Sequence, residues 1–416
     1  MENPKIRFKG FTKDWEQRKL GEVLISLQSN TLSRADLSNE TGIAKNVHYG
    51  DVLIKFGDVL DVSREQLPMI KDEKILDKYK ASFLQNGDVI IADTAEDTTV
   101  GKCSEIAGLR DEVVLSGLHT IPYRPVEKFA TGYLGYYLNS GAYHDQLIPL
   151  MQGIKVTSIS KSAMQDTDIV HPKSTEEQAM IGSYFQSLDH LITLHQRKCE
   201  QTKKLKKYML QKMFPQNGAK VPEIRFDGFT YDWEQRKLSE LLEKYEDPVE
   251  TPHDGYERVG IRSHAKGTFH SFVEPGKELD TAKMYRVAAD KFILNITFAW
   301  EHAVAITDNN DAGKLVSHRF PQFSFNPKLK PHFFKYLMLD KKFREHLELS
   351  SPGGAGRNRV LKISDMLKYE IKLPSIEEQI KIGEYFDSLD YLITLHQRKC
   401  DELKKMKKYM LQNMFI

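Results

Sequence analysis

The stretch EEQAMIGSYFQSLDHLITLHQRKCEQTKKLKKYMLQKMF, residues Glu176–Phe214, returns nearly unchanged as EEQIKIGEYFDSLDYLITLHQRKCDELKKMKKYMLQNMF at Glu377–Phe415. A duplication of this length shows how the chain is organised, because it divides the sequence into two similar halves. Each half ends with one copy of the segment. The properties of this segment therefore decide how the two halves can be arranged.

Both copies have the features of one long helix. Ser174 precedes Glu177, and Ser375 precedes Glu378, at the spacing of a helix-capping box, and no proline interrupts the following stretch. Mostly apolar residues then recur at heptad spacing: Ile181, Leu188, His195, Thr202 and Met209 in the first copy, and Ile382, Leu389, His396, Leu403 and Met410 in the second. A helix roughly 60 Å long with so narrow an apolar stripe needs a partner helix. The other copy is the obvious partner.

The connection between the halves indicates the direction of this pairing. The segment PQNGAKVP, Pro215–Pro222, ends the first helix and spans at most roughly 28 Å when fully extended. It cannot return the chain along a helix of roughly 60 Å, so the second half begins near the carboxyl end of the first helix. We therefore predict an antiparallel two-helix coiled coil that separates two similar bodies and relates them by a pseudo-two-fold axis.

A shorter repeat, which we call the frame, lies at the start of each body. The sequence IRFKGFTKDWEQRKL at Ile6–Leu20 returns as IRFDGFTYDWEQRKL at Ile224–Leu238, and its tryptophans, Trp15 and Trp233, are expected to anchor each body to the helices. Between frame and helix the sequences differ, but strand-like runs, a polar loop, an aromatic helical stretch and a glycine-containing loop follow in the same order. We predict that both bodies share one α+β (mixed α/β) fold.

These repeats define the expected boundaries. They are 1–174 for the first body, 175–214 for the first long helix, 215–222 for the linker, 223–374 for the second body, and 375–416 for the second long helix.

Composition excludes several classes of protein. The net charge of +2 does not by itself indicate a nucleic-acid partner. No apolar run approaches the roughly 18 residues of a membrane span, and the amino terminus lacks the pattern of a secretion signal, so a cytoplasmic protein is expected. The three cysteines, Cys103, Cys199 and Cys400, form no CxxC pair, which argues against a disulfide framework or a zinc ribbon.

No catalytic motif is complete. The sequence TTVGKCSE lacks the first glycine of a phosphate-binding loop and has Cys103 where serine or threonine would bind magnesium. The chain contains no HExxH, no histidine pattern typical of a metal site, and no Asn-Pro-Pro-Tyr or Asn-Pro-Pro-Phe motif. The carboxylates of ADTAED, residues 92–97, could form a metal site, but the sequence favours a polar loop at the end of a strand. We predict no catalytic residue and no metal ligand in this chain.

Polar loops in each body are the candidate DNA contacts. Glycine allows close approach to phosphate, lysine and arginine neutralise it, and glutamine, asparagine, serine, threonine and arginine can bond to base edges. The alternative for each loop is a solvated surface turn. The first-body candidates are Thr94, Thr98, Thr99, Lys102, Gln152, Gly153, Lys155, Ser158 and Lys161. The second-body candidates are Arg262, Ser263, His264, Lys266, Arg357, Asn358, Arg359 and Lys362. For Trp300, DNA contact and simple packing are both open.

The residues WEQRKLGEV, IEEQIKIGEYFDSLD and LITLHQRKC resemble the specificity subunit of type I restriction-modification enzymes, and the resemblance extends over essentially the whole chain. It implies two target-recognition domains that alternate with two helical regions. Each domain would read one part of a split sequence in double-stranded DNA. The chain would choose the site in a bacterial defence system and perform no chemistry itself.

The resemblance also implies partners. Two methyltransferase (modification) subunits would bind the helical regions, and restriction and translocation subunits would join through them. Those partners, and not this chain, would use S-adenosylmethionine, ATP and magnesium.

Two other classes of function remain open. The chain could be a nuclease whose carboxylates form no recognised motif, and cleavage or methylation of DNA by the purified chain would support that. It could also be a coiled-coil scaffold that joins proteins without touching DNA. A reconstituted complex that protects no specific sequence would favour the scaffold.

Overall fold

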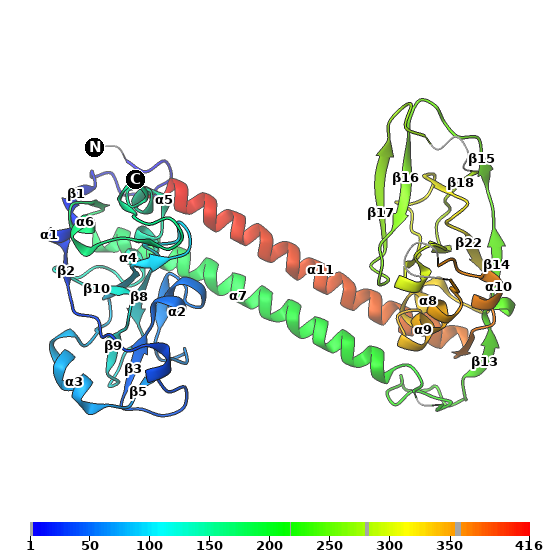
Figure 1. Ribbon diagram of the computed structural model, residues 1–416, viewed down its shortest axis with the longest axis horizontal. Helices are drawn as coiled ribbons and strands as arrows, with labels where there is room; N and C mark the ends of the chain where they lie inside the picture. Colours follow the sequence, from blue (N-terminus) through cyan, green and yellow to red (C-terminus); the bar gives the residue numbers. More distant parts are fainter. Residues whose placement is uncertain (1–2, 217, 279–282, 354–358) are drawn as a thin grey trace. The chain divides into compact units, whose positions relative to one another are not determined.

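The computed structural model describes residues 3–216, 218–278, 283–353 and 359–416 (Figure 1). The chain divides into two compact units. The first unit contains Met1–Gln196 and Gln397–Ile416, and the second contains Arg197–His396. Each unit therefore combines one body with a segment of each long helix.

The two expected long helices are present as α7, Thr175–Lys212, and α11, Ile376–Asn413 (Figure 1). Both begin with the predicted serine cap. The backbone N–H of Glu177 donates to Ser174 Oγ at 3.3 Å, and the N–H of Glu378 donates to Ser375 Oγ at the same distance. The serine oxygens satisfy one of the donors that a helix start leaves unpaired.

In the first unit, the start of α7 packs against the end of α11. Phe185 near the start of α7 stacks on Phe415, just beyond α11, with ring centroids 5.7 Å apart. Farther along α7, Ile192 belongs to the same buried cluster as Cys400 and Leu403 of α11. The two helix segments therefore run in opposite directions within this unit.

The second unit repeats this packing with the roles of the helices exchanged. Phe386 near the start of α11 stacks on Phe214, just beyond α7, at 6.0 Å, and the thiol of Cys199 donates to the Ile393 carbonyl at 3.8 Å. Trp233 packs edge-on against Phe214 at 6.2 Å. The predicted antiparallel pairing is confirmed in both units.

The short frame is fixed to the start of each long helix by a buried ion pair. Arg7 Nε lies 2.6 Å from a carboxylate oxygen of Glu177, and Arg225 Nε lies 2.7 Å from Glu378. Both carboxylates are almost completely buried, so loss of either arginine would leave an uncompensated charge. Trp15 also donates to Glu177 at 3.3 Å, which agrees with its expected anchoring role.

The first body is built on a five-stranded sheet whose order is β2-β10-β6-β8-β4. Its central strand, β6, is buried along its whole length, as expected for a strand covered on both faces. A three-stranded sheet, β5-β3-β9, and the pair β1-β12 also belong to this body. The strand bounds are β1 Glu16–Lys19, β2 Leu24–Ser26, β3 Ala44–Val47, β4 Val59–Asp61, β5 Met69–Ile70, β6 Val89–Ala92, β8 Cys103–Ala107, β9 Val114–Ser116, β10 Thr120–Pro125 and β12 Asp168–His171.

Short helices surround these sheets. The most buried is α4, Tyr133–Leu138, all of whose residues are buried because it packs between the sheet and the long helices. The other helices of the first body are α1 Leu20–Val23, α2 Tyr49–Ile54, α3 Glu73–Tyr79, α5 Gly141–His144 and α6 Lys161–Gln165.

The second body contains a four-stranded sheet in the order β14-β22-β19-β20, which reproduces the order β2-β10-β6-β8 of the first body. The predicted common α+β fold is therefore confirmed. A second sheet, β15-β18-β21-β16-β17, ends in the hairpin β16-β17. The strand bounds are β13 Glu234–Lys237, β14 Leu242–Tyr245, β15 Pro248–Val249, β16 Tyr256–Ile261, β17 Thr268–Val273, β18 Met284–Arg286, β19 Phe292–Leu294, β20 Val304–Ile306, β21 Leu315–Ser317, β22 Gln322–Phe325 and β23 Glu370–Leu373.

The strands β13 and β23 pair antiparallel, as β1 and β12 do.

The helices of the second body are short, like those of the first. The helix bounds are α8 Pro331–Leu337, α9 Lys341–Leu349, α10 Ile363–Met366 and the 3-10 turn η5 Ala299–Glu301.

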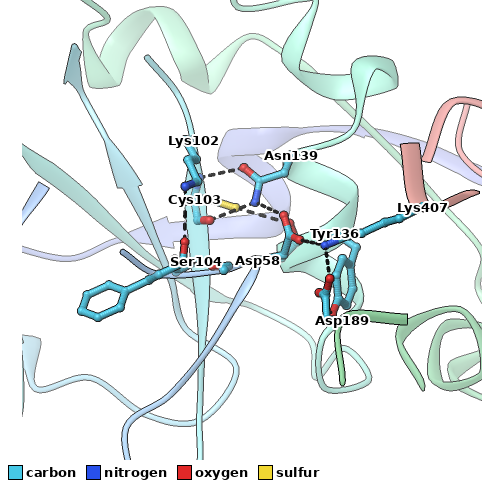
Figure 2. Close-up of polar contacts among 11 residues, drawn as sticks. Asp58, Lys102, Cys103, Ser104, Tyr136, Asn139, Asp189 and Lys407 are labelled. Atoms are coloured by element: carbon cyan, nitrogen blue, oxygen red, sulfur yellow. Dashed lines mark hydrogen bonds and ion pairs between the residues drawn. The ribbon is translucent and has the colours of Figure 1, made fainter. Parts of the chain in front are cut away.

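A polar network joins the first body to both long helices (Figure 2). Lys407 of α11 donates to Asp58 and to Asp189 of α7, each at 2.6 Å. Tyr136 of α4 donates to the other oxygen of Asp189 at 2.8 Å, and Asn139 donates to Asp58 at 2.7 Å. Burial opposes the charge of Lys407, but the two carboxylates outweigh it and raise the pKa of the ammonium group.

The second unit has an equivalent network. Lys206 of α7 donates to Asp390 of α11, and Tyr336 of α8 donates to the other oxygen of Asp390 at 2.8 Å. Asp387 extends this network and accepts from Tyr336 and Lys335, both at 2.6 Å. Each body is thus fixed by a lysine from one repeat and an aspartate from the other.

Candidate DNA-recognition surface

Two loops of the first body, residues 93–102 after β6 and residues 152–161 before β12, lie side by side. The short strand β7, Thr94–Ala95, pairs antiparallel with β11, Thr157–Ser158. The N–H of Ile159 also donates to the Asp93 carbonyl at 2.9 Å. This contact brings two predicted residues, Thr94 and Ser158, directly opposite each other. We call these two segments the first loop pair.

The second segment of this pair forms a tight hairpin. Gln152 and Ser158 exchange backbone hydrogen bonds of 2.9 and 2.8 Å at its base. Gly153 has a φ of 115°, and a Cβ there would meet the Val156 carbonyl oxygen at 2.0 Å, so only glycine fits. The tip exposes Ile154 completely, together with Lys155 and Val156. Lys161, at the start of α6, is also exposed.

The first segment of the pair is held by its own hydroxyl and carboxylate groups. The N–H and the hydroxyl of Thr99 donate to Asp97 at 2.9 and 2.5 Å, and the hydroxyl lowers the pKa of that carboxyl group. Thr98 is exposed beside them. Asp93 accepts from the Thr94 hydroxyl at 2.8 Å.

Lys102 has a different environment from the other candidates. Its ammonium group donates to the carbonyl of Leu53 at 2.7 Å and to that of Phe56 at 3.3 Å, next to the end of α2. The side chain is half-buried, and burial lowers the pKa of the ammonium group. Lys102 therefore fastens the first loop pair to α2, a role that its sequence context did not indicate.

An aromatic and imidazole cluster beside the first loop pair was not predicted. His119 Nδ1 lies 3.3 Å from an Asp93 oxygen and 3.4 Å from the Thr94 hydroxyl. The ring of Tyr49 meets the His119 ring edge-on at 5.3 Å, and the His48 ring lies 4.7 Å from Tyr49. These residues come from α2 and the β9-β10 turn, far from both loops in sequence, so no local pattern indicated them.

In the second body, the turn of the hairpin β16-β17 contacts η5. The N–H of His264 donates to the Glu301 carbonyl at 2.9 Å, and the N–H of Ala265 donates to the His302 carbonyl at 2.8 Å. The Ser263 hydroxyl donates to the Glu301 carboxylate at 2.6 Å. Two predicted residues, Ser263 and His264, are therefore held against the loop after β19, whereas Arg262 and Lys266 are exposed.

The loop before β23 meets the same loop after β19. The N–H of Leu361 donates to the Ile296 carbonyl at 2.8 Å, which matches the contact of Ile159 with Asp93 in the first body. We call residues 295–303 and 359–362 the second loop pair. Lys362 is exposed in it. The candidates Arg357 and Asn358 lie outside the described residues.

Arg359 is positioned by packing. Its guanidinium group lies over the Trp300 ring at 5.2 Å and donates to the carbonyls of Glu348 at 3.1 Å and Ser351 at 3.2 Å. The indole N–H of Trp300 donates to the Thr297 carbonyl at 3.1 Å. The Trp300 ring thus supports Arg359 inside the second loop pair.

One face of the hairpin β16-β17 combines basic and aromatic side chains that were not all predicted. Arg258 Nε donates to the Ser271 hydroxyl at 2.9 Å, and Arg262 lies over the Phe269 ring at 5.3 Å. Phe269 covers Gly260 on the opposite strand. A two-stranded ribbon of this kind fits the major groove of DNA, and arginine is well suited to guanine edges. We call Arg258, Arg262, Phe269 and Ser271 the ribbon face.

Metal sites and membrane spans were searched in the described part of the chain. There, no three or more histidine, cysteine, aspartate and glutamate residues are grouped so that they could hold a metal ion. Within the same residues, no helix is long and apolar enough to cross a membrane.

Two bodies of one fold, each presenting a loop pair with its own set of polar and basic side chains, define a protein with two separate recognition domains. The chain belongs to the type I restriction modification DNA specificity domain family, whose model matches residues 12–204 and 231–405.

Two relatives from Methanocaldococcus jannaschii carry names of type I restriction enzyme specificity subunits. The MjaX subunit is 26% identical, over 95% of this chain and 91% of its own length. The MjaVIII subunit is 24% identical, over 62% of this chain and 63% of its own length. The crystal structure of a type I restriction-modification S subunit from M. genitalium has the same fold, with a TM-score of 0.59 over 100% of this chain and 99% of that chain, at 13% identity.

The family and the repeated fold together assign the chain's role. It is a specificity subunit of a type I restriction-modification system with two target-recognition domains.

Proposed function

We propose that each body reads one half of a split, asymmetric sequence in double-stranded DNA. The observation that supports this most is a backbone hydrogen bond that links the two loops of each pair and occurs in both bodies. Ile159 bonds to Asp93 in the first body, and Leu361 bonds to Ile296 in the second. The loops linked by this equivalent backbone hydrogen bond have different side chains in the two bodies, as expected if the two bodies read different bases.

The side chains of the two bodies suit different contacts. The first loop pair offers hydroxyl, amide and lysine groups, which can bond to phosphates and to several base edges. The second body offers arginines on the ribbon face and in the second loop pair, which favour guanine edges and phosphates. The full target is therefore asymmetric.

The chain itself performs no reaction in this proposal. It binds two methyltransferase subunits that modify adenine, and restriction and translocation subunits join through them. Those subunits use S-adenosylmethionine, ATP and magnesium. The close repetition of the frame and the long helices supports two equivalent binding sites, because equivalent partners need equivalent surfaces.

Mapping of methylated adenines in cells that contain this chain and its partner subunits tests the proposal. We expect one split motif with two specified parts separated by unspecified bases. A continuous motif, or methylation without sequence preference, would contradict it. Cleavage of DNA by the purified chain alone would favour a nuclease instead.

A further inference from the structure

The hairpin of the first loop pair ends in an uncovered apolar side chain. Ile154 is fully exposed at the tip, and Val156 next to it is 53% exposed. Both lie between Gln152 and Ser158, whose backbone hydrogen bonds close the hairpin. Isoleucine and valine lose the most when they stay in water, so an apolar tip of this kind is costly unless a partner covers it.

The stem below this tip is fixed in the core of the first unit. Ile159 is buried in the main apolar cluster of the unit, and Met151 packs against the same cluster. Ser158 also pairs with Thr94 on the neighbouring segment. Because Ile154 is β-branched, its side chain is stiff as well. A stiff side chain on a stem that is anchored at both ends can press into a ligand instead of folding back.

The hairpin is basic around its apolar tip. Residues 151–163 contain two lysines, Lys155 and Lys161, and no acidic residue. Both lysines are exposed. The carboxylates of the loop pair, such as Asp97, lie on the other segment. Lysines beside the tip can bond to DNA phosphates and hold the apolar side chain against the base pairs.

The second body differs in sequence at this position. Leu361 makes the backbone hydrogen bond that Ile159 makes in the first body, so the residues that precede the two can be aligned by counting. Ile154 lies five residues before Ile159, and Gly356 lies five residues before Leu361. Gly356 is outside the described residues. Because glycine has no side chain, the aligned sequences place the bulky apolar residue in the first body alone.

We infer that Ile154 is a wedge that enters the DNA duplex between two neighbouring base pairs at the first half-site and unstacks them. Isoleucine is among the side chains that DNA-bending proteins insert in this way, and the resulting kink brings more protein surface against the duplex. Pyrimidine–purine steps unstack most easily, so the wedge selects such a step without bonding to its bases. The inference rests on the proposed function, in which the first body reads one half-site.

Contact with a thymine methyl group in an undistorted groove is the other use of an apolar side chain on DNA. Such a contact covers one side of the isoleucine, whereas insertion between base pairs covers all of it. The complete exposure of Ile154 on a projecting tip therefore favours insertion.

Duplexes that contain 2-aminopurine test the inference, because the fluorescence of this base rises when it unstacks. The complete complex of this chain and its methyltransferase subunits is bound to duplexes in which 2-aminopurine replaces one adenine at a time, on either strand, in and next to the first half of the mapped motif. The methylated adenine is left unchanged. Every TA or CA/TG step contains an adenine, so each flexible step is sampled.

We expect a fluorescence rise of about threefold or more at one step, where the wedge removes a stacking neighbour. Ile154→Ser should abolish this rise, and Ile154→Leu, which keeps the bulk of the side chain, should retain most of it. Ile25→Ser is the matched control and should change nothing. Ile25 is 56% exposed in the same body, but it pairs with Arg124, whereas the loop-pair end of β10 is Thr120, opposite Ala92.

The inference is overturned if no step shows the rise, or if Ile154→Ser leaves the rise intact. Without a rise, binding that weakens equally for Ile154→Ser and for uracil in place of one thymine would show a methyl contact instead. Loss of a methyltransferase subunit from the Ile154→Ser complex would show a protein contact. The proposed function is judged separately, since a split methylation motif without unstacking would contradict the wedge alone.

Discussion

Lys407 lies 2.6 Å from Asp189, so that α11 and α7 are tied together inside the first unit (Figure 2). The equivalent lysine of the other repeat, Lys206, makes the equivalent contact with Asp390 inside the second unit. In both units the lysine also lies 5.1 Å from the centre of a tyrosine ring, that of Tyr136 or Tyr336. Each body is therefore held by side chains from both repeats.

Lys407→Met should destabilise the first unit. The change leaves the carboxylates of Asp58 and Asp189 without their shared cation in a site where the lysine is only 17% exposed. Removing one partner of a largely buried ion pair is costly, and we expect a loss of about 2–3 kcal/mol. Denaturant unfolding measures it. Lys405→Met, on the exposed side of the same helix, should change stability by less than about 0.5 kcal/mol.

Gly153→Ala should disturb the first loop pair. Its φ of 115° disfavours any other residue, and the new Cβ would collide with the Val156 carbonyl. We expect methylation at the target to fall at least tenfold, with thermal stability nearly unchanged because the hairpin is exposed. Gly87→Ala is the control, since Gly87 has a similar φ of 92° but open space around its Cβ position. Equal activity of the two variants would argue against the hairpin as a DNA contact.

Arg258→Ala should weaken recognition by the second body. Arg258 is exposed on the ribbon face and is oriented by Ser271. Loss of an arginine that bonds to a base edge costs about 1–3 kcal/mol of discrimination. We therefore expect a relaxed preference in one half of the methylated motif. Arg236→Ala, which removes a half-buried arginine paired with Glu234 in the frame, should leave the motif unchanged.

Glu105 should make the stability of the first unit depend on pH. Burial raises the pKa of its carboxyl group from 4.5 to about 7, although backbone N–H groups at the start of α4 oppose the shift. Between pH 4.5 and 7 the folded chain keeps this proton while the unfolded chain releases it. With respect to this group, the free energy of unfolding is therefore highest below pH 4.5, and it decreases as the pH rises to about 7.

The size of this effect is measured against Glu105→Gln, which cannot titrate. A shift of this size corresponds to ~3 kcal/mol. The unfolding free energy of the unaltered chain, minus that of the variant, should fall by about this amount from pH 4.5 to 7. A difference that stays constant over this range would show that Glu105 is already ionised in the folded chain.

The helix pair was predictable from the sequence because its signals extend over many residues. The heptad spacing indicated a partner helix, and the short linker Pro215–Pro222 indicated the opposite direction. Contacts such as Phe185 with Phe415 follow from that direction once the repeats are aligned. The loops were found for a similar reason, since glycine and polar residues interrupt strand-like runs on both sides.

Individual roles within the surface were not predictable, because they depend on contacts between segments far apart in the chain. In the sequence, Lys102 has the pattern of an exposed lysine in a polar loop. In the structure, it donates to a carbonyl of α2, which is far away in the chain. His119 joins Asp93 only through the pairing of β10 with β6. Arg258 and Phe269 share a face because of the hairpin register, which no short motif records.

The most direct test of the account replaces residues Ser239–Leu373 with the corresponding body of another specificity subunit and maps methylated adenines in cells that also contain the partner subunits. The account predicts that one half of the split motif changes while the other half stays as it was. Changes in both halves, or in neither, would contradict the assignment of one half-site to each body.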